Sequence, residues 1–207
     1  MKASYKFYRG CYRFARAAFG LFFWFDVKGK ENIPEGGAMI CANHSSMMDP
    51  IFVAFAFGID CFTHFIAKVE LFRIPVLSAV IVKLGAISVD RGVQDIGTIK
   101  VTLGYLKKGE KVAIFPEGTR SSVDDSIAAK SGAVRLAERA EVPLVPIFVP
   151  RKKLIFRKTP LVIGEPYYIE KVTGKRTQGD YAQLADILMG KIKALNPGAR
   201  GNIKLRA

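Results

Sequence analysis

The sequence predicts an α/β fold, in which a single domain has a largely parallel central sheet flanked by helices. Two observations support this prediction: short apolar runs alternate along the chain with helix-length segments, and half of the 207 residues are hydrophobic. A chain of this length can bury a substantial core as one domain, and it shows no internal repeat or low-complexity linker. We therefore expect a basic amphipathic helix over residues 1–25 and one domain over residues 26–207.

Each expected strand is a short apolar run bounded by turn residues. The strands are expected over residues 21–28, 38–42, 62–67, 86–89, 111–115, 144–149 and 161–169. Pro146 and Pro166 interrupt the last two runs, which indicates that these strands lie at a sheet edge or contain bulges.

The expected helices are longer segments, and most of them end at a glycine. They cover residues 49–57, 75–84, 95–108, 127–140 and 181–195. Gly58, Gly85 and Gly109 follow the first three. The helix over residues 75–84 is strongly apolar, so we expect it to be buried.

The N-terminal segment has two faces when it is drawn as a helix. A basic face and an apolar face each recur at intervals of three and four residues. The basic residues are Lys2, Lys6, Arg9, Arg13 and Arg16, and the apolar residues are Phe7, Cys11, Phe14, Ala18 and Phe22. The apolar tract 17–25 is about 14 Å long as a helix, too short for a hydrocarbon core of about 30 Å. The helix therefore packs on its own domain or lies in the cytoplasmic membrane interface, and the second alternative is preferred.

The chain is strongly basic, with 32 Lys and Arg residues against 18 Asp and Glu residues and a net charge of +14 at pH 7. This excess indicates an anionic partner, such as an anionic membrane surface, a phosphorylated small molecule or a nucleic acid. We expect no nucleic acid, because the chain lacks the aromatic and basic stacking motifs of single-strand binders. The three cysteines are scattered in apolar sequence without metal-ligand spacing, so we expect reduced thiols in a cytosolic compartment.

The most informative stretch spans residues 43–50, between the expected strand 38–42 and the helix that Asp49 opens. This tight connection can bring the Asp49 carboxylate to one imidazole nitrogen of His44 and leave the other nitrogen facing a cleft. Such an arrangement suits a general base, because the carboxylate fixes the tautomer and stabilises the imidazolium formed during proton transfer. Asp followed by Pro is also a common helix start, so the spacing alone leaves a structural role open.

Two further expected strands end in polar clusters, one containing Arg91 and one spanning residues 117–121. Ligands of open α/β sheets bind beyond the carboxyl ends of the strands, so both clusters can share one crevice with the histidine. Arg91 and Arg120 supply planar donor groups suited to phosphate, and Thr119 and the backbone at Gly118 add donors nearby. Taken singly, each arginine can equally form a surface ion pair and the glycine can equally serve a turn.

Four ordered segments together resemble the motifs of a known enzyme family. They are His44-x4-Asp49, Lys68 to Pro75 followed by Gly85 and Arg91, Phe115 to Ser121, and Val142 to Ile147. In this order they resemble the four motifs of the glycerolipid acyltransferases, and the bacterial 1-acylglycerol-3-phosphate acyltransferases are the most similar. The resemblance covers residues 26–170. It implies transfer of a fatty acyl group from acyl-CoA or acyl carrier protein to lysophosphatidic acid, which gives phosphatidic acid.

The resemblance also implies roles for individual residues. His44 acts as the base on the acceptor hydroxyl, and Asp49 orients His44. The residues implied to hold the glycerol phosphate are Arg91, Glu117, Gly118, Thr119 and Arg120. Lys68 and the Gly118 amide are candidates for stabilising the thioester oxyanion. No metal or redox cofactor is implied.

The residues leave several alternatives open. The acceptor can be another lysolipid or glycerol 3-phosphate, and a thioester hydrolase would use the same base with water. A non-enzymatic membrane-binding module would leave the His–Asp pair unused. Ser45 and Ser46 suggest an acyl-serine intermediate, but a side chain adjacent in sequence to His44 is poorly placed to be activated by it, so direct transfer is preferred. We expect a peripheral or monotopic protein at the cytoplasmic face of the cell membrane.

Overall fold

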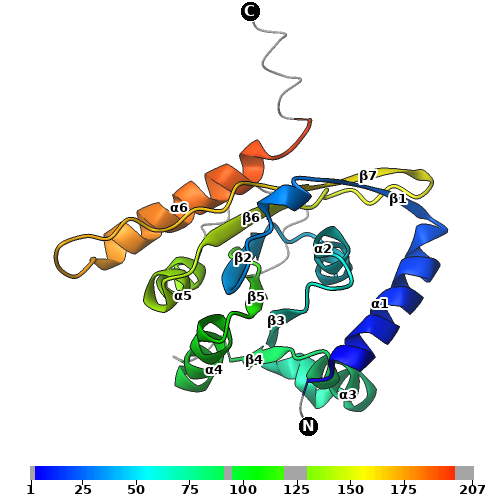
Figure 1. Ribbon diagram of the computed structural model, residues 1–207, viewed down its shortest axis with the longest axis horizontal. Helices are drawn as coiled ribbons and strands as arrows, with labels where there is room; N and C mark the ends of the chain where they lie inside the picture. Colours follow the sequence, from blue (N-terminus) through cyan, green and yellow to red (C-terminus); the bar gives the residue numbers. More distant parts are fainter. Residues whose placement is uncertain (1–2, 91–94, 119–129, 199–207) are drawn as a thin grey trace, which may run out of the picture.

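The computed structural model describes residues 3–90, 95–118 and 130–198. In this part of the chain a seven-stranded sheet has the order β1-β7-β6-β2-β5-β3-β4 and carries helices on both faces (Figure 1). Neighbouring strands are parallel except for β6 and β7, which are antiparallel. The predicted α/β fold with a largely parallel sheet is therefore confirmed.

The strands are β1 (Phe23–Lys28), β2 (Ala38–Ala42), β3 (Thr63–Lys68), β4 (Ile87–Val89), β5 (Lys111–Ile114), β6 (Leu144–Phe148) and β7 (Arg157–Ile163). The α-helices are α1 (Tyr5–Gly20), α2 (Asp49–Phe57), α3 (Pro75–Lys83), α4 (Ile96–Lys107), α5 (Gly132–Ala140) and α6 (Gln178–Ala194). Two short 3-10 helices are η1 (Lys30–Asn32) and η2 (Val69–Arg73).

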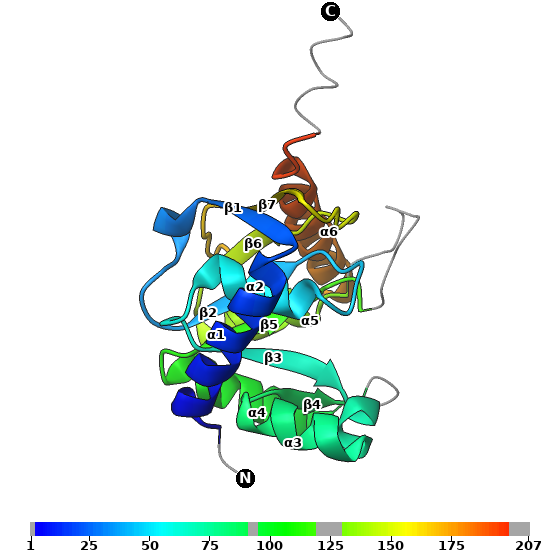
Figure 2. The ribbon, with the colours of Figure 1, turned by 90° about the vertical axis from the view of Figure 1, so that its right-hand side faces the viewer.

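The central strand β2 explains why the fold has two cores. All five of its residues are buried, and successive side chains of a strand point to opposite faces of the sheet. Ile40 packs in a cluster with α2, and α1 lies across the same face (Figure 2). Met39 packs on the other face with residues of α4, α5 and α6. The sheet is therefore covered on both sides, as parallel sheets usually are.

The parallel strands place their carboxyl ends at one edge of the sheet. β2 pairs in parallel with β5 on one side and with β6 on the other. The residues that follow these three strands therefore meet at this carboxyl edge, which includes His44 after β2 and Glu117 after β5.

Helix α1 packs on the domain through a face other than the predicted apolar face. Tyr8 is buried, and Tyr12 and Phe19 contact the core, with the Tyr12 ring 5.3 Å from that of Phe55 in α2. The predicted apolar face lies beside this packing face, and its Phe14 is 78% exposed. The helix thus packs on the domain and also presents apolar side chains outward. Within the described residues, no helix is long and apolar enough to cross a membrane.

Helix α3 corrects another expectation. Its sequence is apolar and begins at Pro75 as predicted, but none of its residues is buried, and Val76 is 79% exposed. It follows η2 and precedes β4, so it packs at the edge of the sheet, where the start of α1 contacts its last residue, Lys83. Apolar composition alone could not distinguish a buried helix from a helix that exposes an apolar face.

Three late elements have other bounds than expected. β7 spans Arg157–Ile163 instead of residues 161–169, because its polar first half pairs in register with β1. Helix α6 begins at Gln178, three residues earlier than expected, behind a capping box formed by Thr177 and Asp180. Helix α5 begins at Gly132, and the first residues of its predicted range lie outside the described residues.

Pro146 lies in an interior strand, so the edge alternative is wrong for β6 and the bulge alternative is confirmed. Ile147 pairs with Ile163, but Leu144 pairs with Tyr167, which leaves one extra residue on the second strand. The Pro146 carbonyl accepts from the Gly164 N–H at 2.9 Å, and the proline has no N–H to return. The absent N–H of Pro146 therefore lies where the pairing of β6 with the segment after β7 is already irregular.

Candidate active site

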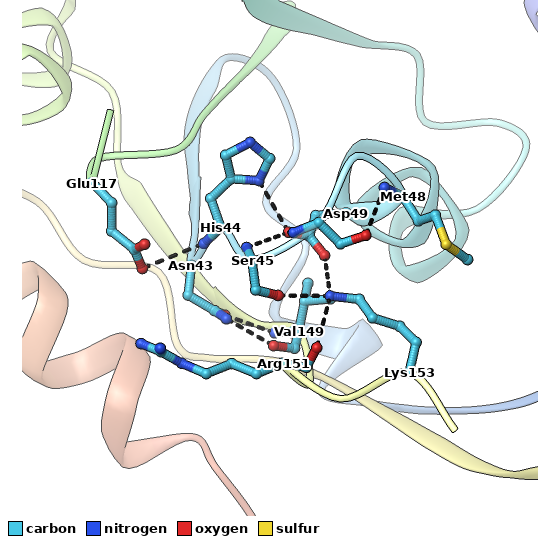
Figure 3. A network of polar contacts seen from close by, with 10 residues as sticks. Asn43, His44, Ser45, Met48, Asp49, Glu117, Val149, Arg151 and Lys153 are labelled. Carbon is cyan, nitrogen blue, oxygen red and sulfur yellow. Dashed lines mark hydrogen bonds and ion pairs between the residues drawn. The ribbon is translucent and has the colours of Figure 1, made fainter. Parts of the chain in front are cut away.

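The predicted contact between His44 and Asp49 is confirmed. The Nδ1 atom of His44 lies 3.0 Å from Oδ2 of Asp49, which is fully buried (Figure 3). The imidazole of His44 is 15% exposed, and Figure 3 shows its other nitrogen turned away from Asp49. One ring nitrogen is thus fixed by a carboxylate, and the other is available to a substrate.

The loop between β2 and α2 is closed by the same carboxylate. The backbone N–H groups of Ser45 and Ser46 donate to Asp49 Oδ2 at 2.6 and 2.7 Å. Asp49 is the first residue of α2, and Pro50 follows it in the first turn. Because the aspartate caps its own loop, the five-residue spacing folds into one geometry that also aims the carboxylate at His44.

Lys153 completes the environment of Asp49 and was not among the predicted site residues. Its Nζ atom forms an ion pair with Oδ1 of Asp49 and donates to the Ser45 hydroxyl at 2.7 Å, and its side chain is 7% exposed. Burial disfavours ionisation of Asp49, but the hydrogen bonds from His44, Lys153 and Ser45 outweigh it and lower the pKa of the carboxyl. Asp49 is therefore held in its charged form.

The opposite side of His44 is formed by residues that follow β5. The Phe115 ring stacks on the imidazole with a centroid separation of 4.1 Å. Oε1 of Glu117 accepts from the backbone N–H of His44 at 3.3 Å, and Glu117 is only 4% exposed. Burial raises the pKa of Glu117, while the hydrogen bond from His44 and the charge of Arg151 act against this rise. These contacts fix both the plane of the ring and the position of its backbone.

Asn43 fastens the start of the loop to the neighbouring strand. Its side-chain amide donates to the Val149 carbonyl at 2.7 Å, and its oxygen accepts from the Val149 N–H at 2.8 Å. The side chain therefore replaces a strand residue between the ends of β2 and β6. His44, the next residue, leaves the sheet from a fixed point.

Comparison with known proteins decides the family. Residues 25–150 match a family model described as Acyltransferase. The chain belongs to the acyltransferase family.

Two curated relatives of this acyltransferase carry the same name, 1-acyl-sn-glycerol-3-phosphate acyltransferase. The protein from Bacillus subtilis is 35% identical over 176 residues, which cover 82% of this chain and 86% of the relative. The protein from Borreliella burgdorferi is 32% identical over 128 residues, which cover 58% of this chain and 49% of the relative.

A solved structure shares the fold. It is the crystal structure of the 1-acyl-sn-glycerophosphate (LPA) acyltransferase PlsC from Thermotoga maritima, with a TM-score of 0.67 and 27% sequence identity. The match covers 92% of this acyltransferase and 80% of the chain from Thermotoga maritima.

The other predicted site residues of the acyltransferase have different outcomes. Arg91, Thr119 and Arg120 lie outside the described residues, so their roles stay predictions. Lys68 is the last residue of β3 and is exposed, and the described part of the chain shows no contact between its side chain and His44.

Gly118 forms a turn immediately after the strand-end motif. Its φ of 70° lies in the left-handed region, and a Cβ atom there would come within 2.9 Å of the Lys130 side chain. Its N–H donates to the Phe115 carbonyl at 3.0 Å, so this amide is engaged within the turn. The roles of Gly118 in binding the acceptor and the oxyanion stay predictions.

Proposed function

We propose that this acyltransferase moves a fatty acyl group from a thioester donor, acyl-CoA or acyl carrier protein, to lysophosphatidic acid and forms phosphatidic acid. The observation that carries the proposal is the His44–Asp49 pair, which leaves one imidazole nitrogen available at the carboxyl edge of the sheet. The family and the names of relatives that match most of the chain support this acceptor. In this proposal the reaction supplies phosphatidic acid for phospholipid biosynthesis.

The proposed reaction needs only acid–base chemistry. The free Nε2 of His44 takes the proton of the acceptor hydroxyl as the hydroxyl oxygen attacks the thioester carbonyl carbon. The tetrahedral intermediate then expels the thiolate, which takes the proton back from the imidazolium. Asp49 stabilises the imidazolium between these two transfers. No step changes an oxidation state, so we expect no redox cofactor, and His44 and Asp49 carry every proton transfer without a metal in this proposal.

Holding the two substrates in attack geometry can contribute more than moving the proton. A positioned base is worth about 10²- to 10⁴-fold in rate, and attack geometry can contribute roughly 7–11 kcal/mol. Arg91 and Arg120 are proposed to anchor the glycerol phosphate, and Gly118 and Thr119 lie in the same motif. Glu117 is bonded directly to the His44 backbone, so a substrate that contacts it lies beside the base.

The serines next to His44 have other tasks in the structure. The Ser45 hydroxyl accepts from Lys153, and the Ser46 hydroxyl accepts from the Met48 N–H at 3.2 Å. Both serines also donate their backbone N–H groups to Asp49. These contacts favour direct transfer over an acyl-serine intermediate. If Ser45→Ala and Ser46→Ala both lost turnover but still bound substrate, the acyl-serine intermediate would be favoured over direct transfer.

A peripheral position on the cytoplasmic face of the membrane fits the exposed apolar residues of the carboxyl edge. Exposed large apolar side chains occur on the α1–β1 turn, the start of β1 and the β6–β7 loop: Leu21, Phe22, Trp24, Leu154, Ile155 and Phe156. The two segments are tied together, because the Phe156 N–H donates to the Phe22 carbonyl at 2.6 Å and the two rings lie 6.0 Å apart. Exposed Arg157 and Lys158 follow, which suits an anionic lipid surface.

The membrane proposal has a direct reporter, because Trp24 is the only tryptophan of the chain. Anionic vesicles that contain a lipid-borne quencher are expected to quench its fluorescence, and Ile155→Ser is expected to weaken the quenching. Ile187→Ser changes an equally apolar, exposed residue on α6 and is expected to have no effect. Equal quenching in wild type and Ile155→Ser, or none in wild type, would contradict a membrane contact at this edge.

A thiol-release assay tests the activity itself. Wild-type protein with acyl-CoA is expected to release thiol only when lysophosphatidic acid is present, and His44→Ala is expected to lose about 10²- to 10⁴-fold in rate. Arg120→Ala is expected to raise the KM for the acceptor. Glu141→Gln, at an exposed carboxylate, is expected to change neither the rate nor the KM for the acceptor. Release without an acceptor would indicate a hydrolase. Release with glycerol 3-phosphate alone would indicate the other acceptor class.

A further inference from the structure

A cavity of about 440 Å³ opens beside the His44–Asp49 pair, on the face of the sheet that α6 covers. Asn43 and Glu117 form its end nearest the pair, and the C-terminal part of α6 forms its far wall. It adjoins the candidate active site, because Glu117, which lines it, accepts from the backbone N–H of His44.

The cavity combines a basic rim with an apolar floor. Arg151 and Lys152 reach it from the β6–β7 loop, and Lys193 reaches it from α6. Figure 3 shows the Arg151 side chain running to the Glu117 side of His44, away from Lys153. Met189 and other apolar side chains line the interior. Such a lining suits a ligand that has an anionic group and a less polar arm.

The carboxylate in the wall indicates which groups the arm carries. Oε1 of Glu117 is bonded to His44, but Oε2 is buried and has no hydrogen-bond partner among the described residues. An unsatisfied buried acceptor costs about 1–3 kcal/mol, so a ligand N–H or O–H at this place would bind favourably. The arm therefore carries hydrogen-bond donors.

The proposed function requires two anionic substrates at once. Direct transfer needs donor and acceptor bound together, and each of them carries phosphate, so their like charges must be held at separate places. The basic residues of the cavity come from the β6–β7 loop and α6, so they are separate in the chain from Arg91 and Arg120, which are proposed for the acceptor phosphate. We therefore assign the cavity to the other anionic substrate, the acyl donor.

We propose that this cavity binds the phosphopantetheine part of the acyl donor, the group that acyl-CoA and acyl carrier protein share. Arg151 and Lys193 pair with its phosphate, and the amide N–H groups of its arm pass Glu117 toward His44. The inference rests on the proposed function, because it assigns the second substrate of the same reaction.

Steady-state kinetics of the full chain test the assignment. Arg151→Gln and Lys193→Gln are each expected to raise the KM for acyl-CoA about 10- to 100-fold, the loss of a charge-assisted hydrogen bond, and to leave the KM for lysophosphatidic acid within about twofold. Lys191→Gln is the matched control, because this lysine is also on α6 but packs over the Tyr167 ring. Thermal unfolding of each variant verifies that it is folded.

The donors and inhibitors separate the possible outcomes. Free 4′-phosphopantetheine is expected to compete with acyl-CoA in wild type and to lose most of its inhibition in Arg151→Gln, whereas pantetheine inhibits both weakly. A comparable defect with acyl carrier protein supports the shared phosphate, and a defect with acyl-CoA alone would overturn it in favour of the nucleotide. A raised KM for lysophosphatidic acid with an unchanged donor KM would assign the cavity to the acceptor. If wild type releases thiol without any acceptor, the acyl-transfer proposal fails while the donor site is still measured.

Discussion

Replacement of Lys153 by methionine isolates the electrostatic support of the His44–Asp49 pair. Methionine keeps much of the length and apolar volume of lysine but removes its charge. The variant leaves Asp49, which is fully buried, without the ion pair at Oδ1. The three hydrogen bonds at Oδ2, from the imidazole and from two backbone N–H groups, remain.

The expected cost follows from these contacts. Removing one partner of a buried ion pair costs about 3–5 kcal/mol, and the three remaining hydrogen bonds place this variant near the lower value. For a chain of this size, about 3 kcal/mol corresponds to a fall of roughly 6–12 °C in Tm. Lys171→Met removes an exposed ion pair with Glu141 and is expected to leave Tm unchanged.

The pH dependence of kcat/KM for Lys153→Met is expected to reflect the loss of a positive charge. Without the lysine, the His44–Asp49 pair carries an uncompensated negative charge and takes up a proton at higher pH. The acidic limb of the kcat/KM profile therefore moves to higher pH. Within the described residues, charged groups that also face the pair are Glu117 and, beside it, Arg151, and neither is changed.

A double-mutant cycle shows whether the lysine acts through Asp49. In an Asp49→Asn background, Lys153→Met is expected to cost far less stability and to leave no shift of the acidic limb. Lys153→Arg, which keeps the charge, is expected to restore much of the wild-type pH profile. If Lys153→Met costs the same stability in both backgrounds, or if the pH profile of the single variant is unchanged, the reasoning is refuted.

Three further predictions follow from single contacts. Gly85→Ala is expected to lower the free energy of unfolding in urea by about 2–5 kcal/mol, because φ is 74° and a Cβ would lie 2.6 Å from Nδ1 of the buried His64. Gly10→Ala, which has open space around it, is expected to raise the free energy of unfolding by about 0.5–1 kcal/mol. Asn43→Ala is expected to lose about 2–4 kcal/mol, because two buried backbone groups of Val149 lose their partners, and an unchanged urea midpoint would contradict this. The lowered pKa of Asp49 means that its ionised form stabilises the fold above the ordinary value of 3.8 and that this contribution disappears as the pH falls; Asp49→Asn is therefore expected to flatten the acid side of the stability curve.

The fold was predictable wherever an element has a local signature. The strand over residues 38–42 is a short apolar run before a polar loop, and its bounds are confirmed. Helix α2 also has its predicted bounds, because Asp49 and Pro50 mark its start and Gly58 its end. Such signals act within one turn or one strand, so a single sequence contains them in full.

Elements that depend on a distant partner were predicted less well. The first half of β7 is polar, and it is a strand because β1 pairs with it over residues 23–28. The exposure of α3 depends on its position at the sheet edge, which its own apolar sequence does not contain. In both cases the tertiary context outweighs the local pattern.

The same distinction applies to the candidate site. His44 and Asp49 were predicted because their spacing within one loop limits their geometry. Lys153 was missed because it lies in a basic segment of the β6–β7 loop, where one lysine resembles its neighbours. Only its position beside the buried carboxylate, in the loop that follows the strand next to β2, distinguishes it.

The separation between reacting groups and supporting groups has a consequence for how the site assembles. His44 and Asp49 are five residues apart, whereas Glu117 is 73 residues from His44 and Lys153 is 108 residues from Ser45. The spacing of the pair is local, but its compensating charge and its ring support come from the segments that follow β6 and β5. The same segments line the cavity beside Glu117. The proposed base therefore has its full electrostatic environment only in the fold that also forms the proposed donor site.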